Sequence, residues 1–296
     1  MKDRGINAHV PSKSDIDKVV ACGCEWIRID LDWRFIEPSK NAFKWSLYDT
    51  AISYSKQNGL KIYATLAYVP AWINKDSRKC PDKKSWIDFC TIAAKRYVGK
   101  VDIFSLWNEP NLKDFFKGSQ KDYINKILIP GYQAIKAVNK SIVVAGGDLS
   151  TASKSSWTSW FSLLKKNAKY FDVFAWHVYD SSANSVISRF KFGKIPIVGW
   201  IVPKWRPFKW YISGIKKKGK RIFLTETGLK ASANKNKELS NQENFVKNIS
   251  KIAKETKSEI VFIYDLKDSP LQKDKWGIFD DKVNPKKSAK WLMNHK

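Results

Sequence analysis

The stretch "VDIFSLWNEPN" at residues 101–111 decides how the chain is organised. It begins as a run of β-branched and aromatic residues, which is typical of a strand buried on both faces. It then breaks into Asn108, Glu109 and Pro110. Such an ending is either an ordinary turn or a carboxylate presented at the point where a buried strand ends. The number and spacing of similar strands in the rest of the chain distinguish these two readings.

Eight runs of this kind recur along the chain, with amphipathic helical patterns between them. The runs cover residues 4–10, 26–31, 61–68, 101–107, 141–147, 171–179, 221–227 and 259–266. The helical patterns fill residues 14–23, 46–59, 85–99, 120–139, 155–168, 204–218, 240–257 and 285–294. Strands that alternate with helices predict parallel pairing with right-handed crossovers.

At 296 residues the natural closure of eight such units is a (β/α)8 TIM barrel, predicted as a single domain over residues 1–296. A doubly wound open sheet is the second choice, but no Gly-x-Gly-x-x-Gly or phosphate-loop pattern follows any of the runs. The connection from Asp180 to about Pro203 is expected to be an irregular insertion. Its aromatic and basic part is either a wall of a binding site or the packed start of the next helix.

The chain is strongly basic, with a formal net charge of +26. One interpretation is a polyanionic partner. The other is a solubilising bias, favoured because 46 of the 54 basic residues are lysines and arginine is the better group for bidentate anion recognition. No apolar run approaches the roughly 18 residues of a membrane span, and the N-terminus has no apolar leader. The cellular location stays open, as does a disulfide between Cys80 and Cys90.

Polar and aromatic residues gather where the predicted strands end. In a barrel of this type the chemistry lies at the C-terminal ends of the strands, so these residues are the candidates for a site. They are His9, Arg28, Asp30, Trp72, Asn108, Glu109, His177, Tyr179, Glu226, Tyr264 and Trp276. Two of the three histidines of the chain are among them.

Each candidate also has a structural alternative. Arg28 could form an ion pair with Asp30, and His177 could be a hydrogen-bonded histidine of the core. Trp72 and Trp276 could cap the core. Glu226 is harder to explain in this way, because a carboxylate between two threonines of an apolar strand needs a partner or a purpose.

Glu109 and Glu226 are predicted on the fourth and seventh strands, which lie across the barrel from one another. Retaining glycosidases need two carboxyl groups about 5–5.5 Å apart, one to protonate the leaving oxygen and one to attack the anomeric carbon. Aromatic side chains at the rim also suit sugars, whose apolar faces stack on rings. The residues themselves therefore favour glycoside hydrolysis.

"WNEPN" at 107–111 and "LTETG" at 224–228 resemble the acid/base and nucleophile motifs of clan A glycoside hydrolases. Within the clan the chain is most similar to family 39, especially its bacterial exopolysaccharide-degrading members. Segments over the whole length carry this resemblance: 5–10, 26–49, 59–72, 86–111 and 262–289. Family 5 is the competitor. It usually has a histidine after the third strand and a tryptophan on the eighth, where this chain has "AYVPAW" and Tyr264.

The resemblance implies a retaining O-glycoside hydrolase that cleaves a poly- or oligosaccharide, such as an exopolysaccharide, neutral or acidic, at internal linkages. It implies Glu109 as acid/base and Glu226 as nucleophile, with Arg28 and Tyr179 holding Glu226. Asn108 is expected to contact the sugar 2-hydroxyl and His177 to orient the nucleophile or the substrate. Neither a cofactor nor a metal is expected, and neither is nucleic acid. The alternatives are a barrel that binds an acidic polysaccharide without cleaving it, and a family 5-like endoglycanase or β-xylosidase; the oligomeric state stays open.

Overall fold

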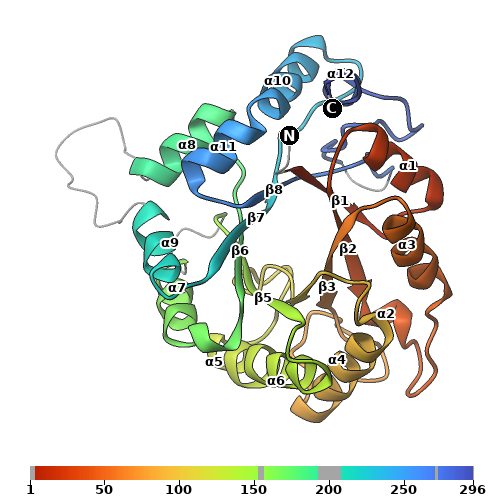
Figure 1. Ribbon diagram of the computed structural model, residues 1–296, viewed down its shortest axis with the longest axis vertical. Coiled ribbons are helices and arrows are strands. Elements are labelled where there is room, and N and C mark those ends of the chain that lie inside the picture. The colour runs from red at the N-terminus through yellow and green to blue at the C-terminus, as the bar shows by residue number, and fades with distance from the viewer. Residues whose placement is uncertain (1–3, 153–156, 193–207, 271–272, 296) are drawn as a thin grey trace.

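Eight parallel strands close into a barrel, and helices surround it (Figure 1). The computed structural model describes residues 4–152, 157–192, 208–270 and 273–295. The strands pair in chain order, and β1 closes the barrel by pairing with β8. They are β1 Arg4–His9, β2 Trp26–Asp32, β3 Lys61–Ala67, β4 Ile103–Leu106, β5 Val143–Ser150, β6 Val173–His177, β7 Arg221–Thr227 and β8 Ile260–Ile263. The predicted (β/α)8 barrel and all eight of its strands are confirmed.

The helices follow the predicted pattern with some differences. They are α1 Lys13–Ala21, α2 Trp33–Ile36, α3 Ser46–Gln57, α4 Lys83–Tyr97, α5 Gln120–Asp122, η1 Tyr123–Leu128, α6 Ile129–Val138, α7 Trp157–Lys166, η2 Ala168–Tyr170, α8 Ala183–Phe192, α9 Phe208–Lys216, α10 Asn236–Lys247, α11 Ile249–Thr256 and α12 Lys287–Asn294. The connection after Asp180 was wrongly expected to be irregular, because α8 forms in its first half. Its remainder, residues 193–207, lies outside the described residues.

The start of α1 shows how local sequence sets a helix boundary. The helical pattern was expected to start at residue 14, and the helix begins one residue earlier, at Lys13. Ser12 is the N-cap. Its hydroxyl accepts from the Asp15 backbone, and the Asp15 carboxylate accepts from the Ser12 backbone. This reciprocal capping box satisfies two backbone N–H groups at once, which explains why Ser12 is the cap.

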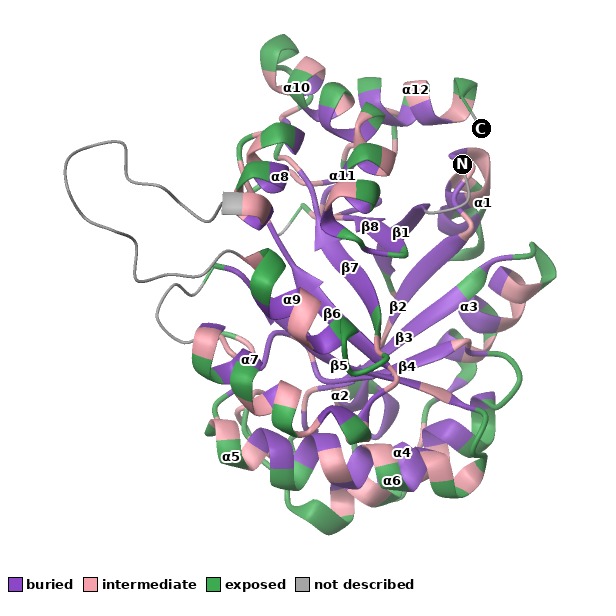
Figure 2. Ribbon diagram, turned by 60° about the vertical axis from the view of Figure 1, so that its left-hand side comes forward, coloured by how far each residue is buried: buried purple, intermediate pink, exposed green. Residues whose placement is uncertain are grey.

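The lumen of the barrel is apolar toward the N-terminal ends of the strands. Trp26, Phe223 and Phe262 pack edge to face there, with ring centroids 5.7 and 6.3 Å from Trp26. A Cβ on Gly5 would lie 2.4 Å from the Phe262 ring, so β1 leaves the space that this ring fills. The strands are buried along most of their length, while the helices expose their outer faces (Figure 2). Toward the C-terminal ends the lumen becomes polar, and the candidate site begins there.

Two further expectations concern cysteines and membranes. All four cysteines are free thiols, including Cys80 and Cys90, so the disulfide left open by the sequence is not formed. In the described part of the chain, every helix is too short or too polar to span a membrane.

Candidate active site

The backbone turns sharply where several strands end. His9 at the end of β1, Tyr68 after β3 and Glu109 after β4 have φ angles of 52°, 66° and 41°. Within β5, Gly147 and Asp148 are also left-handed, with φ of 107° and 42°, and the register with β6 shifts at this point. Left-handed backbone is unfavourable for residues other than glycine, and it is often retained at functional sites. These turns redirect side chains that a regular strand would point elsewhere.

Glu109 is held in place by its own loop. Its backbone N–H donates to the carbonyl of Asp148 across β5, at 3.2 Å. Two residues on, Asn111 exchanges two hydrogen bonds with the Ser150 backbone, at 2.7 and 3.0 Å. The "NEPN" turn is therefore attached to the neighbouring strand at both ends, and the Glu109 carboxylate is only 5% exposed.

Glu226, on β7, receives hydrogen bonds on both of its oxygens. The Arg28 guanidinium donates to Oε1, and the Tyr179 hydroxyl donates to Oε2. Arg28 also donates to Asn108 at 2.7 Å, to Asn7 at 2.8 Å and to Thr65 at 3.1 Å, which fixes the plane of the guanidinium. Burial alone would raise the pKa of Glu226. The opposing charges of His177 and Arg28 and the Tyr179 hydrogen bond outweigh it and lower that pKa, so the carboxylate is ionised.

His177 links the two glutamates and a third buried carboxylate. Its Nδ1 lies 2.9 Å from Glu109 Oε1 and 3.4 Å from Glu226 Oε2, and its Nε2 lies 3.3 Å from Asp148 Oδ1. Burial would lower the pKa of this imidazole. The negative charge of Glu226 and the hydrogen bonds to Asp148 and Glu109 raise it instead, to about 9. His177 is therefore an imidazolium at neutral pH.

Carboxylate oxygens of Glu109 and Glu226 lie within 4.8 Å of each other. This agrees with the separation of about 5–5.5 Å typical of retaining enzymes, and it is well below the 6.5–9.5 Å of inverting ones. Together with His177, the two glutamates are close enough to share a cation. The two carboxylates already have cationic partners, since Arg28 binds Glu226 and the His177 imidazolium binds Glu109. We therefore assign no metal ligands here.

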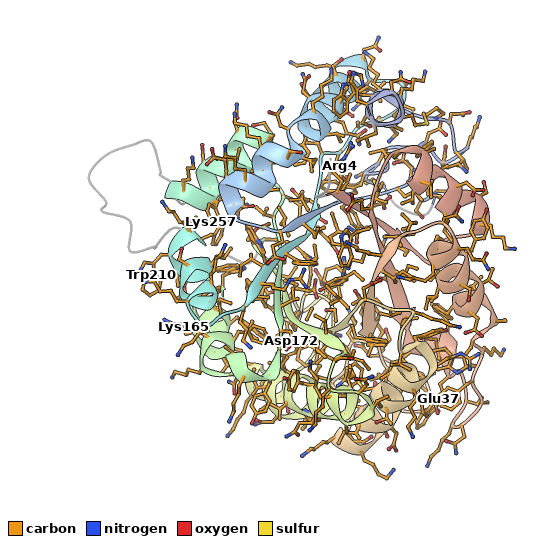
Figure 3. All side chains as sticks on the ribbon, viewed as in Figure 1. Arg4, Glu37, Lys165, Asp172, Trp210 and Lys257 are labelled. Atoms are coloured by element: carbon orange, nitrogen blue, oxygen red, sulfur yellow. The ribbon has the colours of Figure 1, made fainter. Side chains whose placement is uncertain are left out.

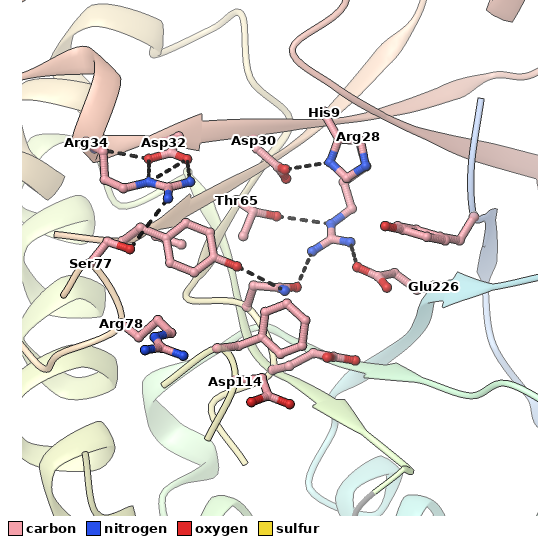
Figure 4. Close-up of a pocket in the computed structure, with 16 residues that line it drawn as sticks. His9, Arg28, Asp30, Asp32, Arg34, Thr65, Ser77, Arg78, Asp114 and Glu226 are labelled. Atoms are coloured by element: carbon pink, nitrogen blue, oxygen red, sulfur yellow. Dashed lines mark hydrogen bonds and ion pairs between the residues drawn. The ribbon is translucent and has the colours of Figure 1, made fainter. Parts of the chain in front are cut away.

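A cleft of about 370 Å3 opens over these groups (Figure 4). In the close-up, Arg28 and Glu226 lie side by side, and Arg34 and Arg78 lie on the opposite side of the cleft. Those two arginines are each paired, Arg34 with Asp32 and Arg78 with Asp76. The residues that line the cleft are His9, Arg28, Asp30, Asp32, Arg34, Thr65, Ala67, Tyr68, Ser77, Arg78, Asn108, Glu109, Asp114, Phe115, Glu226 and Tyr264.

The model of the cellulase family, glycosyl hydrolase family 5, matches residues 4–269. The chain belongs to glycosyl hydrolase family 5. Its motifs resemble those of family 39 more, and family 39 enzymes are among the solved structures that align with it. A family 39 glycoside hydrolase from Bacteroides cellulosilyticus WH2 aligns at a TM-score of 0.75 and 20% identity over 99% of this chain. A family 39 β-xylosidase from Caulobacter crescentus aligns at 0.73 and 16% over 98% of this chain and 70% of its own length.

Xylanase 10B of Thermotoga maritima also aligns, at a TM-score of 0.69 and 15% identity over 99% of this chain and 94% of its own. At such identities the likeness establishes the shared barrel fold alone. The chain spans 62% of the length of the Bacteroides enzyme. No curated protein matches the sequence significantly. Both families named by the comparisons are glycoside hydrolase families, as the clan A resemblance predicted.

In this family 5 member, most of the sequence-predicted site residues meet at one end of the barrel. Tyr179 packs edge to face against Tyr264 and Trp276, at 5.9 and 4.9 Å between ring centroids, and forms an aromatic wall beside Glu226. His9 lies 2.8 Å from Asp30 and 3.7 Å from Asp265. Burial would lower the pKa of His9, but the hydrogen bonds to Asp265 and Asp30 raise it. The alternative pairing of Arg28 with Asp30 is not formed, because Arg28 binds Glu226 instead.

Trp72 is the exception among the predicted residues. Its indole donates to the Glu37 carbonyl at 2.9 Å and packs edge to face on the buried Trp33. Like Trp276 it does not line the cleft, but its ring packs on the core instead of on Tyr179, so the structural alternative, a cap on the core, describes it better.

Sequence reasoning missed several residues of the site. Asp148 was lost because the fifth strand was ended at Gly147, although the strand continues to Ser150. Thr65, Arg34 and Arg78 also contribute to the cleft. The sequence offered one indication of Asp148, namely that a carboxylate directly follows the apolar "AGG" of the fifth strand. Nothing in the sequence around Arg78 marks it, since a loop brings it to the cleft.

Proposed function

We propose that this chain is a retaining O-glycoside hydrolase that cleaves a poly- or oligosaccharide, such as an exopolysaccharide or a related glycan. The observation that carries the proposal is the pair of buried carboxyl groups whose oxygens lie within 4.8 Å, one bound by Arg28 and Tyr179 and the other by His177. This difference in partners separates their roles. The charged partners of Glu226 hold it ionised, as a nucleophile must be, which leaves the acid role to Glu109.

Glu226 acts as the nucleophile. Its ionised oxygen attacks the anomeric carbon as the glycosidic C–O bond breaks, and it forms a covalent glycosyl-enzyme. Glu109 gives its proton to the departing oxygen in that step. In the second step Glu109 takes a proton from water, whose oxygen attacks the anomeric carbon and releases Glu226. Two inversions at one carbon give net retention.

The rim residues bind and orient the sugar. Asn108, held by Arg28 beside both glutamates, is placed to contact the 2-hydroxyl of the reacting sugar. The aromatic wall of Tyr179, Tyr264 and Trp276 offers an apolar surface to a sugar face. The cleft continues past Glu109 to Arg34, Arg78 and Asp114. Sugars on the leaving-group side can therefore also be held, which supports cleavage at internal linkages.

The cleft lining favours a neutral or weakly charged glycan over a strongly acidic one. Its three arginines face five carboxyl groups, and no lysine is found among the described residues that line it. The lysine excess of the chain therefore lies elsewhere. An acidic polymer would gain little from the electrostatic field of this cleft.

A panel of neutral and acidic polysaccharides tests the proposal. Reducing ends should appear with at least one of them, product lengths should show internal cleavage, and early NMR spectra should show products with retained anomeric configuration. Glu226→Gln is the control, since it keeps the shape of the side chain and removes its charge. Retained polymer binding without cleavage by the wild type across the whole panel would instead support the non-catalytic polysaccharide-binding barrel.

A further inference from the structure

Asp148 is a fully buried carboxylate of the barrel that the two-glutamate mechanism does not use. Four groups from four strands converge on it. The Tyr63 hydroxyl donates to Oδ2 at 2.8 Å, the Thr225 hydroxyl donates to Oδ1 at 2.6 Å, and the Ser105 hydroxyl donates to Oδ2. The fourth group is Nε2 of His177, 3.3 Å from Oδ1. The left-handed turn at Gly147 and Asp148 aims the carboxylate at these partners.

Counting hydrogen bonds fixes the proton on His177 Nε2. An ionised carboxylate accepts hydrogen bonds at about four positions and donates none. Three hydroxyl groups occupy positions on Asp148, and the remaining one faces the imidazole. Burial would raise the pKa of Asp148, but the His177 hydrogen bond and the charge of Arg28 lower it to about 2. Since Asp148 is ionised, Nε2 must donate to it.

The other ring nitrogen of His177 faces two carboxyl groups. Nδ1 lies 2.9 Å from Glu109 Oε1 and 3.4 Å from Glu226 Oε2. Glu226 is held ionised by Arg28 and Tyr179, so a bare lone pair on Nδ1 would point at a negative oxygen. A proton on Nδ1 removes that repulsion and satisfies Glu109 Oε1, which leaves Glu109 Oε2 for the acid proton and the leaving oxygen.

We propose that Asp148 is a positioning residue of the reaction: it holds His177 as an imidazolium whose Nδ1–H lies between Glu109 and Glu226. The catalytic consequence rests on the proposed glycosidase function, whereas the state of His177 can be measured without it. Every charged or titratable group that faces His177 or Asp148 takes part in the balance. These groups are Arg28 and Asp30 on β2, Tyr63 on β3, Glu109 after β4, Tyr123 on η1, Tyr179 after β6 and Glu226 on β7.

The arrangement keeps the buried charge constant during catalysis. Before reaction, Arg28 and His177 are positive, Glu226 and Asp148 are negative, and Glu109 carries the acid proton. In the first step Glu226 becomes a neutral ester, while Glu109 loses its proton to the leaving oxygen and becomes negative. The sum is unchanged, and the Nδ1–H is already in contact with the carboxylate that forms. Such preorganised donors stabilise developing charge without rearrangement.

The nitrogen resonances of His177 in the free protein test the first half of the proposal. In the wild type both ring nitrogens should be protonated at pH 7, with a titration midpoint near the pKa of about 9 expected for this site. In Asp148→Asn the midpoint should fall toward 6.5, the ordinary value. Ser105→Ala, which removes one hydrogen bond from Asp148 but keeps its charge, is the matched control. A neutral His177 in the wild type, or a midpoint unmoved in Asp148→Asn, would overturn the proposal.

Should Asp148→Asn fail to fold, Thr225→Val replaces it. Loss of the Thr225 hydroxyl makes Asp148 Oδ1 a stronger acceptor for His177, so the midpoint should stay or rise, and a fall would contradict the assignment.

The second half of the proposal, the catalytic role of Asp148, is tested by comparing kcat/KM for substrates whose leaving groups differ in basicity. Asp148→Asn should lower kcat/KM at least about tenfold for substrates with basic leaving oxygens, since these need the proton of Glu109. Dinitrophenyl glycosides, which leave without that proton, should change within about twofold. A merely structural loss would lower both alike, and that result would overturn the catalytic role. Absence of any cleavage by the wild type would refute the glycosidase function, while the His177 titration would still decide the state of the Asp148–His177 pair.

Discussion

The two ends of the barrel lumen are built from the same eight strands but contain different chemistry. Toward the N-terminal ends, Trp26, Phe223 and Phe262 fill the lumen with rings. Toward the C-terminal ends, the same strands bury Arg28 and Glu226 with their partners. Burying a charge is costly unless it is paired and hydrogen-bonded, so the polar end must be fully connected, whereas the apolar end needs only volume.

The outer surface shows the opposite distribution of charge. A shallow hollow at the N-terminal side of β6 and β7 is lined by Lys165, Lys166, Ala168, Lys169, Lys218 and Lys220. Lys165 lies beside the half-exposed Trp210, with its ammonium 5.8 Å from the ring (Figure 3). The cleft at the other end is lined by carboxyl groups and arginines. The difference indicates that function is placed at one end and that the lysine surplus is separate from it.

Removing the two glutamates tests the polar end most severely. Glu226→Ala should abolish turnover of every substrate, because the nucleophile is needed whatever the leaving group is. Glu109→Ala should still form the glycosyl-enzyme from aryl glycosides with good leaving groups, and should then stall. Azide should speed Glu109→Ala and give a product of retained configuration. With Glu226→Ala it should occupy the vacated space and give the inverted product.

The anomeric configuration of the azide products, read by NMR, is the measurement. Glu259→Ala is a suitable control, since the Glu259 side chain is 46% exposed and lies just before β8, at the opposite end of the barrel from the cleft. The opposite pairing of configurations would mean that the roles of Glu109 and Glu226 are exchanged.

Arg28 tests whether the charges at the polar end depend on each other. In Arg28→Ala the Glu226 carboxylate loses its paired cation, and kcat/KM should fall by about two to three orders of magnitude, as is typical for the loss of one preorganised donor at a reacting group. The lost cation should also raise the pKa of Glu226. Because the nucleophile must be ionised, the acidic limb of the pH profile of kcat/KM should move to higher pH. Arg28→Lys keeps the positive charge but loses the several donors of the guanidinium, so its kcat/KM should lie between those of the wild type and Arg28→Ala. An acidic limb that does not move in Arg28→Ala would contradict this account.

His177 should make stability depend on pH. Its folded-state pKa of about 9 lies above its ordinary value of 6.5, so its stabilising effect is complete below 6.5 and is lost as pH rises through 9. The free energy of unfolding should therefore fall by about 3 kcal/mol over this range through this residue. His177→Gln should reduce that slope in urea unfolding, leaving the part that comes from His9, whereas His295→Gln, at an exposed position beyond α12, should keep it. Equal slopes in the wild type and His177→Gln would show that His177 is not charged in the folded protein.

The same contrast explains what could be predicted from sequence. Periodicity shows the strands and helices, and the spacing of Glu109 and Glu226 places them on strands four and seven. Arg28 and Tyr179 were expected beside Glu226 from the resemblance, and both donate hydrogen bonds to it. Asp148 is harder to find, since it points inward because of two consecutive left-handed residues. Trp72 was a candidate for stacking on a sugar because it is an aromatic residue after the third strand, but its indole donates to the backbone carbonyl of Glu37. Local backbone turns and loop paths, which depend on tertiary contacts, decided these cases.

The smallest effect is expected at the lysine-lined hollow. Replacing its five lysines by glutamine should leave turnover of soluble substrates within about twofold, because charges at the opposite end of the barrel are screened over about 8 Å at physiological ionic strength. The salt dependence of turnover should likewise change little. The control is a variant with five exposed lysines replaced elsewhere, at Lys40, Lys44, Lys83, Lys140 and Lys290. If the hollow variant alone lost activity on a long acidic polymer, while both variants kept activity on short oligosaccharides, the lysines would be a capture site for the substrate. The interpretation that function lies at the cleft alone, and that the lysine surface only increases solubility, would then be wrong.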